Sequence, residues 1–164
     1  MIDQTQPRPI EFIHKLFATG LYSGYMPIAP GTWGSLVGCI ILWFVWPDKW
    51  YYQALAIAAF YPFAVYFSDQ GVRYFGHDGR QIVIDEVIGQ AVSLFMAPHN
   101  IMGYILGFFL FRLFDIVKLP PARDWEKLRG GYGIVADDIA AGVYAAIVLQ
   151  LLVILSRRIG LEWM

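Results

Sequence analysis

Residues 134–155 read IVADDIAAGVYAAIVLQLLVIL, a stretch with two adjacent aspartates near its start and no charge after them. A helix needs about 20 mostly apolar residues to cross a bilayer, and this segment has that length and composition. It therefore predicts a membrane helix whose first turns carry two carboxylates.

Four earlier stretches are also long and apolar, and they lie at roughly 31–47, 50–68, 82–98 and 100–117. The first two carry no charge, whereas the third meets Asp85 and Glu86 near its start and the fourth meets Arg112 and Asp115 near its end. A full crossing and a re-entrant path both fit the second and fifth of the five segments.

A weaker segment at about 9–20 places Ile10, Ile13 and Phe17 at helical spacing, with charged residues on its other side. This pattern predicts an amphipathic helix that lies along the membrane surface. We therefore expect residues 1–164 to form one all-α domain. It would be a polytopic helix bundle with about five transmembrane segments and an N-terminal amphipathic helix.

The composition excludes several classes of protein. Apolar residues make up 58% of the chain and charged residues 15%, against about 25% charged in an ordinary soluble domain. The net charge is −1, so neither a disordered chain nor a basic nucleic-acid binder fits. The single cysteine, Cys39, excludes an internal disulfide and a cysteine metal cluster. Nothing in the sequence indicates the oligomeric state.

The basic residues predict the orientation in the membrane. Most of the Lys and Arg residues fall in the N-terminal segment or in the linkers 69–81 and 118–133, namely Arg8, Lys15, Arg73, Arg80, Lys118, Arg123, Lys127 and Arg129. Because cytoplasmic loops carry an excess of Lys and Arg, we expect this side of the bundle to face the cytoplasm.

The acidic residues of the predicted helices fall at the same side. If the crossings alternate, Asp85 and Glu86, Asp115, and Asp137 and Asp138 all lie in one shallow cytoplasmic layer. Such carboxylates repel one another unless a cation lies between them. Oxygen ligands without a nearby cysteine favour Mg²⁺, Ca²⁺ or Mn²⁺ over zinc. The alternative is that the acids only stabilise helix N-termini.

Groups that could bind an anion lie beside these acids. The segment 29–35 indicates a loop that opens a helix, where the backbone amides of Gly31 and Thr32 could bind phosphate oxygens. The alternative is a Pro-Gly turn with Thr32 as the helix N-cap. Gly130–Gly133, which precedes the last segment, allows the same two interpretations.

Four cations lie near the acids in the predicted layer, namely Arg112, Lys118, Arg123 and Arg129. Arg112 could bind phosphate or only pair with Asp115 three residues on. Lys118 and Arg123 could do the same or only extend toward the membrane surface. His77 is either solvated or a proton donor to a leaving oxygen.

Acids for a metal beside bases for an anion are what phosphoryl chemistry requires. A divalent-cation or proton-coupled transporter would also place acids in a membrane, but it would need them along a path to the far side. A purely structural bundle with charged helix ends is a third hypothesis.

Three blocks of the sequence carry a resemblance to a known family. They are Pro27–Ser35, then His77-Asp78 with Ile82–Gly89, and finally Phe111–Lys118 continuing through Pro121 to Gly130–Gly142. On these residues the chain resembles the phosphatidylglycerophosphatase A family. The resemblance implies a Mg²⁺-dependent enzyme of the bacterial inner membrane that removes the terminal phosphate of phosphatidylglycerophosphate to give phosphatidylglycerol.

The residues and the resemblance together predict the roles in the site. We expect Mg²⁺ to be held by Asp85, Glu86, Asp115, Asp137 and Asp138. Catalysis would use Asp85, Glu86, Asp137, Asp138 and Lys118, and the substrate would be bound by Gly31, Thr32, Arg112 and Arg123. The attacking group is either water or an aspartate.

Overall fold

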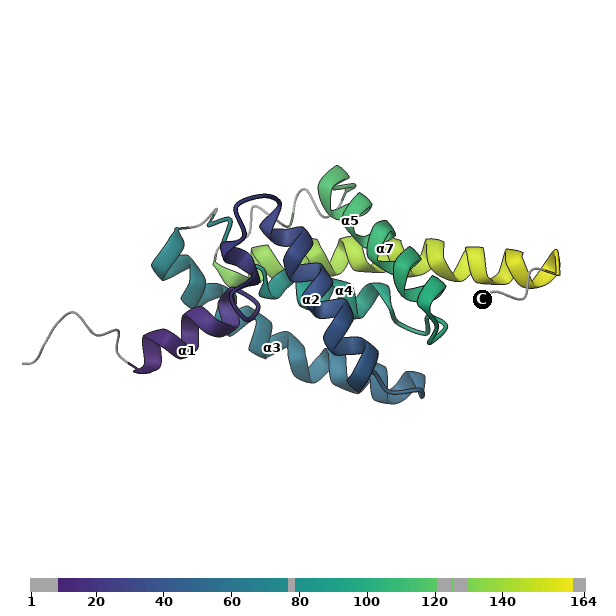
Figure 1. Cartoon of the computed structure of the whole chain (residues 1–164), viewed down its shortest axis with the longest axis horizontal. Coiled ribbons are helices and arrows are strands. Elements are labelled where there is room, and N and C mark those ends of the chain that lie inside the picture. The colour runs from purple at the N-terminus through teal and green to yellow at the C-terminus, as the bar shows by residue number, and fades with distance from the viewer. Residues whose placement is uncertain (1–8, 77–78, 121–124, 126–129, 161–164) are drawn as a thin grey trace, which may run out of the picture.

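The computed structural model describes residues 9–76, 79–120, 125 and 130–160. Over these residues the chain forms six α-helices, one short 3₁₀ helix and no strand (Figure 1). Their bounds are α1 (Pro9–Ala18), η1 (Ser23–Tyr25), α2 (Pro30–Val45), α3 (Trp50–Phe75), α4 (Ile84–Ser93), α5 (Ile101–Val117) and α7 (Gly131–Arg158). The predicted all-α class is therefore confirmed for the described part of the chain.

Helix α7 is the longest element and runs along the long axis of the molecule, with its C-terminal part extending past the other helices (Figure 1). Helices α3, α4 and α5 all pack against it. Its buried face includes Ala141, Ala145, Leu149 and Val153, which recur every four residues. The small residues of this face let the neighbouring helices approach closely.

Helix α7 is the one described helix that is both long and apolar enough to cross a membrane, with a mean hydropathy of 2.4 over its most apolar window. The other four predicted crossings fall on described helices that do not meet both the length and the hydropathy criterion. Helices α2 and α5 have 16 and 17 residues, and α3 has 26 residues with Pro62 inside it. Helix α4 has ten residues, about 15 Å, which is half of a bilayer core. The five-crossing topology is therefore not confirmed.

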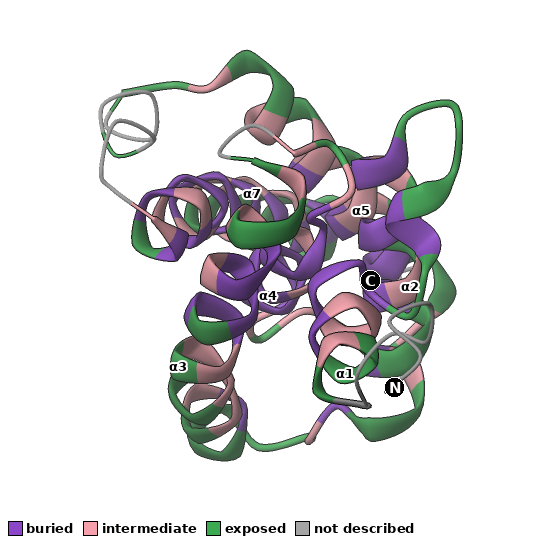
Figure 2. Ribbon diagram, turned by 90° about the vertical axis from the view of Figure 1, so that its left-hand side faces the viewer, coloured by how far each residue is buried: buried purple, intermediate pink, exposed green. Residues whose placement is uncertain are grey.

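The short helix α4 occupies the centre of the bundle. It packs against α2, α3, α5 and α7, and most of its residues are buried (Figure 2). At its crossing with α7, a Cβ atom on Gly89 would lie 2.9 Å from the carbonyl oxygen of Asp138. A Cβ atom on Gly142 would lie 2.5 Å from the carbonyl oxygen of Gly89. Glycine at both positions therefore brings the two backbones together.

Helix α1 corresponds to the predicted amphipathic segment. It leaves Ile10, Phe12 and Ile13 exposed, so an apolar surface remains for a membrane or another partner. His14, one turn after Ile10, is buried against α3, where its Nδ1 lies 3.2 Å from the hydroxyl oxygen of Tyr74 and its Nε2 lies 3.2 Å from that of Tyr66. These contacts hold α1 against α3.

Candidate metal and phosphate site

Three carboxylates meet where α4 and α7 begin to pack together. Asp85 and Glu86 lie in the first turn of α4, and Asp138 lies in the second turn of α7. Each of the three offers one oxygen atom, and these atoms all lie within 4.8 Å of one another. Asp85 and Asp138 are 8% and 3% exposed, so water screens their mutual repulsion poorly. We refer to Asp85, Glu86 and Asp138 as the carboxylate cluster.

Each member of the carboxylate cluster has an unsatisfied oxygen. Asp85 Oδ1, Glu86 Oε2 and Asp138 Oδ2 are buried without a hydrogen-bond partner in the described structure. A buried charged oxygen without a partner is costly, and a hard divalent cation is a partner that such oxygens prefer. The cluster therefore fits a Mg²⁺-type ion by its donor set and by its unmet oxygen atoms.

The other two predicted acids flank the cluster and have basic partners. Asp115, near the end of α5, pairs with Arg112 at 2.6 Å. Asp137 accepts a hydrogen bond from Lys118 Nζ at 2.9 Å. Both acids are close enough to Asp138 to interact with it electrostatically. The structure thus brings the five predicted acids to one place. Three of them have an unmet oxygen, and the other two have a cationic partner within 3 Å, at 2.6 and 2.9 Å.

The capping interpretation accounts for only part of this arrangement. The first turn of α7 contains no acidic residue, so Asp137 and Asp138 lie beyond the turn where the helix dipole acts most strongly. Asp85 and Glu86 do lie in the first turn of α4, yet no side chain caps that helix. The position of the acids along α7 therefore needs another explanation.

Arg112 joins three of the helices that surround the cluster. Besides its ion pair with Asp115, its Nη1 atom lies 3.9 Å from Glu86 Oε1 and 3.5 Å from Ser35 Oγ on α2. Its Nε atom is buried and has no partner in the described residues. The pairing with Asp115 is thus present, and the same guanidinium also reaches Glu86.

The start of α2 lies directly on the cluster. A Cβ atom on Gly31 would overlap Glu86 Oε1, so any larger residue at this position would displace the carboxylate. Ala29 precedes the helix with φ +49°, and no side chain caps it, so the interpretation of Thr32 as N-cap is wrong. The amide of Thr32 donates to the carbonyl of Ala29 at 2.9 Å, so the prediction that this amide binds phosphate is wrong.

Lys118 follows α5 in the left-handed conformation, with φ +47°, and its side chain extends across to α7. Three other residues considered for the site, His77, Arg123 and Arg129, lie outside the described residues, and so does Asp78. The glycines at the crossing of α4 with α7 were not among the predicted site residues, although they bring Asp85 beside Asp138.

Buried carboxylates, the glycine at the start of α2 and two cations lie at one end of the helical bundle. The chain is therefore a helical protein with a candidate metal- and phosphate-binding site. The sequence profile of the phosphatidylglycerophosphatase A family matches residues 16–153. The chain belongs to this family.

Relatives with assigned names share most of their length with this chain. A phosphatidylglycerophosphatase A of Haemophilus influenzae is 41% identical over 142 residues, which are 82% of this chain and 85% of the relative. A phosphatidylglycerophosphatase A of Escherichia coli is 38% identical over 138 residues, with coverage of 82% and 80%. A protein of Bacteroides thetaiotaomicron, provisionally named as a phosphatidylinositol-3-phosphatase, is 36% identical over 146 residues, with coverage of 84% and 92%. No solved structure matches the chain significantly.

Proposed function

We propose that this protein is a lipid phosphatase that hydrolyses the terminal phosphate monoester of phosphatidylglycerophosphate, giving phosphatidylglycerol and inorganic phosphate. The observation that carries the proposal is the carboxylate cluster with three unmet oxygens. Family membership and the names of two relatives support the choice of substrate. The third relative's name refers to another lipid phosphomonoester, so it supports the same class of reaction.

The proposed metal is Mg²⁺, held by Asp85, Glu86 and Asp138, with Asp115 and Asp137 beside it as further acidic ligands or as partners of the cations. When bound, such an ion would supply the positive charge that stabilises phosphoryl oxygens. The alternative of a transporter is less well supported, because the acids gather around one end of α4 and α7 instead of following a path along the bundle.

The chain's own groups have distinct proposed roles around the cluster. Arg112 holds the carboxylates of Glu86 and Asp115 in place, and its unpartnered Nε offers one hydrogen bond to a phosphate oxygen. Lys118 is a second candidate for phosphate, because its Nζ lies at the edge of the site on Asp137. Gly31 and the Thr32 hydroxyl would bind the phosphate from the α2 side, and Arg123 keeps its predicted role as a proposal.

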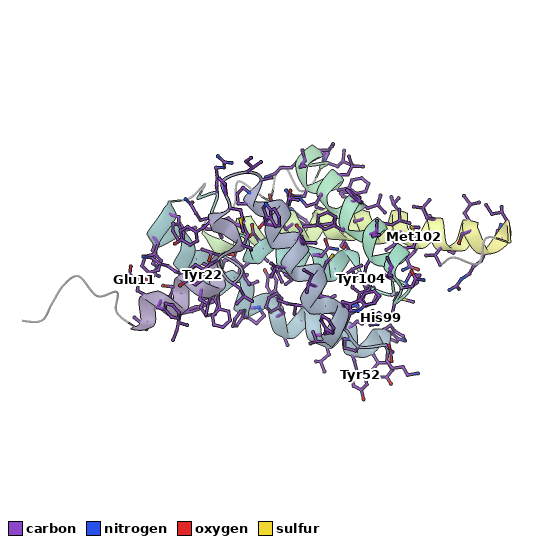
Figure 3. All side chains as sticks on the ribbon, in the orientation of Figure 1. Glu11, Tyr22, Tyr52, His99, Met102 and Tyr104 are labelled. Atoms are coloured by element: carbon purple, nitrogen blue, oxygen red, sulfur yellow. The ribbon has the colours of Figure 1, made fainter. Side chains whose placement is uncertain are left out.

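We further propose that the bundle crosses the bacterial inner membrane several times, with the cluster on the cytoplasmic side. Helix α5 exposes a stripe of large apolar residues at every fourth position, namely Ile101, Ile105, Phe109 and Leu113. Such a stripe is typical of a surface covered by lipid. Tyr52, which is 54% exposed, lies toward the end opposite Glu11 and Tyr22, as expected of an interfacial tyrosine on the far side (Figure 3).

Chelation tests the metal role. Purified protein in detergent should release phosphate from phosphatidylglycerophosphate in Mg²⁺, lose this activity in EDTA and regain it when excess Mg²⁺ is added. Phosphatidic acid and phosphatidylinositol-3-phosphate, assayed in parallel, establish which phosphomonoester is preferred. Full activity in EDTA would remove the metal from the proposal, and failure to cleave any of the three lipids would remove the phosphatase.

Cysteine labelling tests the orientation. Ile28 is 78% exposed near the cluster, and Lys49 is exposed just before α3, near the opposite end. In a Cys39→Ser background, a membrane-impermeant maleimide added to intact cells should label Lys49→Cys, whereas Ile28→Cys should react only after the membrane is opened. The reverse pattern would contradict the proposed cytoplasmic site.

A further inference from the structure

Tyr144 on α7 contacts the chain on both sides of Lys118. Its hydroxyl donates a hydrogen bond to the carbonyl oxygen of Pro120, two residues after Lys118. Its ring packs against the ring of Phe114, four residues before Lys118, with the ring centroids 5.7 Å apart. Tyr144 therefore ties this part of the chain to α7 in addition to the hydrogen bond from Lys118 Nζ to Asp137.

Asp137 and Tyr144 lie on the same face of α7. They are seven residues apart in the sequence, which is two helical turns and about 10 Å along the axis. Asp137 accepts the hydrogen bond from the Lys118 side chain, and Tyr144 binds the backbone two residues further on. The segment 118–120 is thus held against one face of α7 at two points.

Lys118 requires such support because of its backbone conformation. Its φ of +47° and ψ of +70° are left-handed, a region that costs free energy in a residue with a Cβ atom. Glycine is the usual residue in this conformation after a helix. A strained conformation persists only where the surrounding contacts determine it. The amide of Lys118 donates to the carbonyl of Phe114 at 2.9 Å, and the hydroxyl of Tyr144 fixes the chain that follows.

The Lys118 side chain is held beside the site and remains accessible. Its Nζ atom lies 2.9 Å from Asp137 Oδ2, and 32% of the side chain is exposed, against 7% for Asp137. An ammonium group has three donor hydrogens, so it can bind a carboxylate and a phosphate oxygen together. The exposed part of this side chain is where a phosphate oxygen would approach.

We propose that Tyr144 is a positioning residue that fixes Lys118 beside Asp137, where the lysine binds the phosphate group of the substrate. The inference rests on the proposed phosphatase function, and it adds the residue that sets the place of one phosphate-binding cation. Tyr144 acts through the backbone of Lys118 and does not itself touch the substrate.

Tyr144→Phe tests this role, because phenylalanine keeps the ring beside Phe114 and removes the hydroxyl. We expect the KM for phosphatidylglycerophosphate to rise about three- to tenfold, which corresponds to the net contribution of one hydrogen bond. The value of kcat should change by less than about twofold, since a rise in KM at constant kcat reports weaker binding of ground state and transition state alike.

A double-mutant cycle shows whether Tyr144 acts through Lys118. Lys118→Gln should raise KM by at least about tenfold, because it removes a charged hydrogen bond to phosphate. In this background, Tyr144→Phe should change KM by less than about twofold, because the ammonium group that Tyr144 positions is already gone. A tyrosine that only stabilised the bundle would have the same effect in both backgrounds.

Tyr104→Phe is the matched control. The hydroxyl of Tyr104 on α5 donates to the carbonyl oxygen of Leu42 on α2 at 3.2 Å, so this tyrosine also ties another segment to its helix through a backbone carbonyl. It lies eleven residues before Asp115, about 16 Å along α5 from the site. We expect Tyr104→Phe to keep the wild-type KM in both backgrounds, whatever stability it loses.

Inorganic phosphate provides a second measurement that does not involve the lipid part of the substrate. As the reaction product it should inhibit competitively, and its inhibition constant should rise in Tyr144→Phe by the same factor as KM. An unchanged inhibition constant beside a raised KM would mean that Tyr144 affects the binding of another part of the lipid, and it would overturn the inference.

The remaining outcomes separate the inference from the proposed function. If the wild type hydrolyses the lipid and Tyr144→Phe keeps its KM, or raises it equally with and without Lys118→Gln, Tyr144 does not act through Lys118. The inference is then overturned and the phosphatase stands. If the wild type does not hydrolyse the lipid, the proposed function fails and the inference fails with it.

Discussion

Replacing Asp138 by asparagine should reduce kcat/KM for phosphatidylglycerophosphate by at least about 100-fold, the scale seen when one group that stabilises transition-state charge is removed. Asp138 is 3% exposed, and its Oδ2 atom has no partner among the described residues. The amide keeps the shape of the side chain but removes the charge that a metal ion would need. The measurement is phosphate release from the lipid at saturating Mg²⁺.

The same substitution should leave the fold intact in the absence of metal. Asp138 lies among Asp85, Asp115 and Asp137, so the loss of its charge relieves repulsion between buried carboxylates. Without Mg²⁺, the Tm of Asp138→Asn should therefore equal or exceed that of the wild type. Added Mg²⁺ should raise the Tm of the wild type, since a ligand that binds only the folded state stabilises it. It should raise that of the variant much less.

Asp48→Asn is the matched control, because Asp48 is exposed in the turn before α3 and lies outside the site. It should keep both the activity and the Mg²⁺-dependent rise in Tm. If Asp138→Asn keeps full activity, the carboxylate has no catalytic role and the structural bundle becomes the better hypothesis. If Asp138→Asn still responds to Mg²⁺ as the wild type does, the ion binds elsewhere.

The meeting of the acids could be predicted because it depends on a simple property of the sequence. The apolar segments alternate in direction, so the starts of α4 and α7 and the end of α5 fall at one end of the bundle. Every acid of the predicted layer lies near one of these helix ends. Hydropathy periodicity is sufficient to place such residues in a common layer.

The pairing within that layer could not be predicted from the sequence. Lys118 reaches Asp137 because it adopts a left-handed backbone conformation at the end of α5, which lysine rarely does. Thr32 resembled an N-cap, but the left-handed turn at Ala29 places the N-cap three residues earlier. Both outcomes depend on tertiary packing that overrides local preference.

The length of α4 also escaped prediction. Residues 82–98 are apolar enough to suggest a full crossing, yet the helix ends at Ser93. Ser93 donates to the carbonyl of Gln90, and Trp46, which follows α2, donates to the carbonyl of Leu94. These contacts satisfy carbonyls at the end of α4, so the chain can turn there. Hydropathy does not report where such partners lie.

Replacing Gly142 by alanine should disrupt the site from a distance. The added Cβ atom would lie 2.5 Å from the carbonyl oxygen of Gly89 and 2.9 Å from Val92 Cβ, so the backbones of α4 and α7 would have to separate. Overpacking of this kind costs roughly 1–3 kcal/mol. Alanine regains up to about 1 kcal/mol in helix propensity, so we expect a modest net loss of stability. Since the crossing holds Asp85 beside Asp138, activity should fall by more than the stability loss explains.

Gly38→Ala provides the comparison, because Gly38 also faces α4 from a neighbouring helix. Its added Cβ atom would lie 3.3 Å from Val87 Cα, so a shift of a few tenths of an ångström accommodates it. We expect Gly38→Ala to keep activity within about threefold, a change worth less than 1 kcal/mol, whereas Gly142→Ala should lose at least about tenfold and weaken the Mg²⁺-dependent rise in Tm. Equal activity of the two variants would mean that the α4–α7 distance does not control the carboxylate cluster. In that case Gly142→Ala should keep the Mg²⁺-dependent rise in Tm and the lipid phosphatase activity of the wild type. The three carboxylates would then keep their spacing even when α4 and α7 separate.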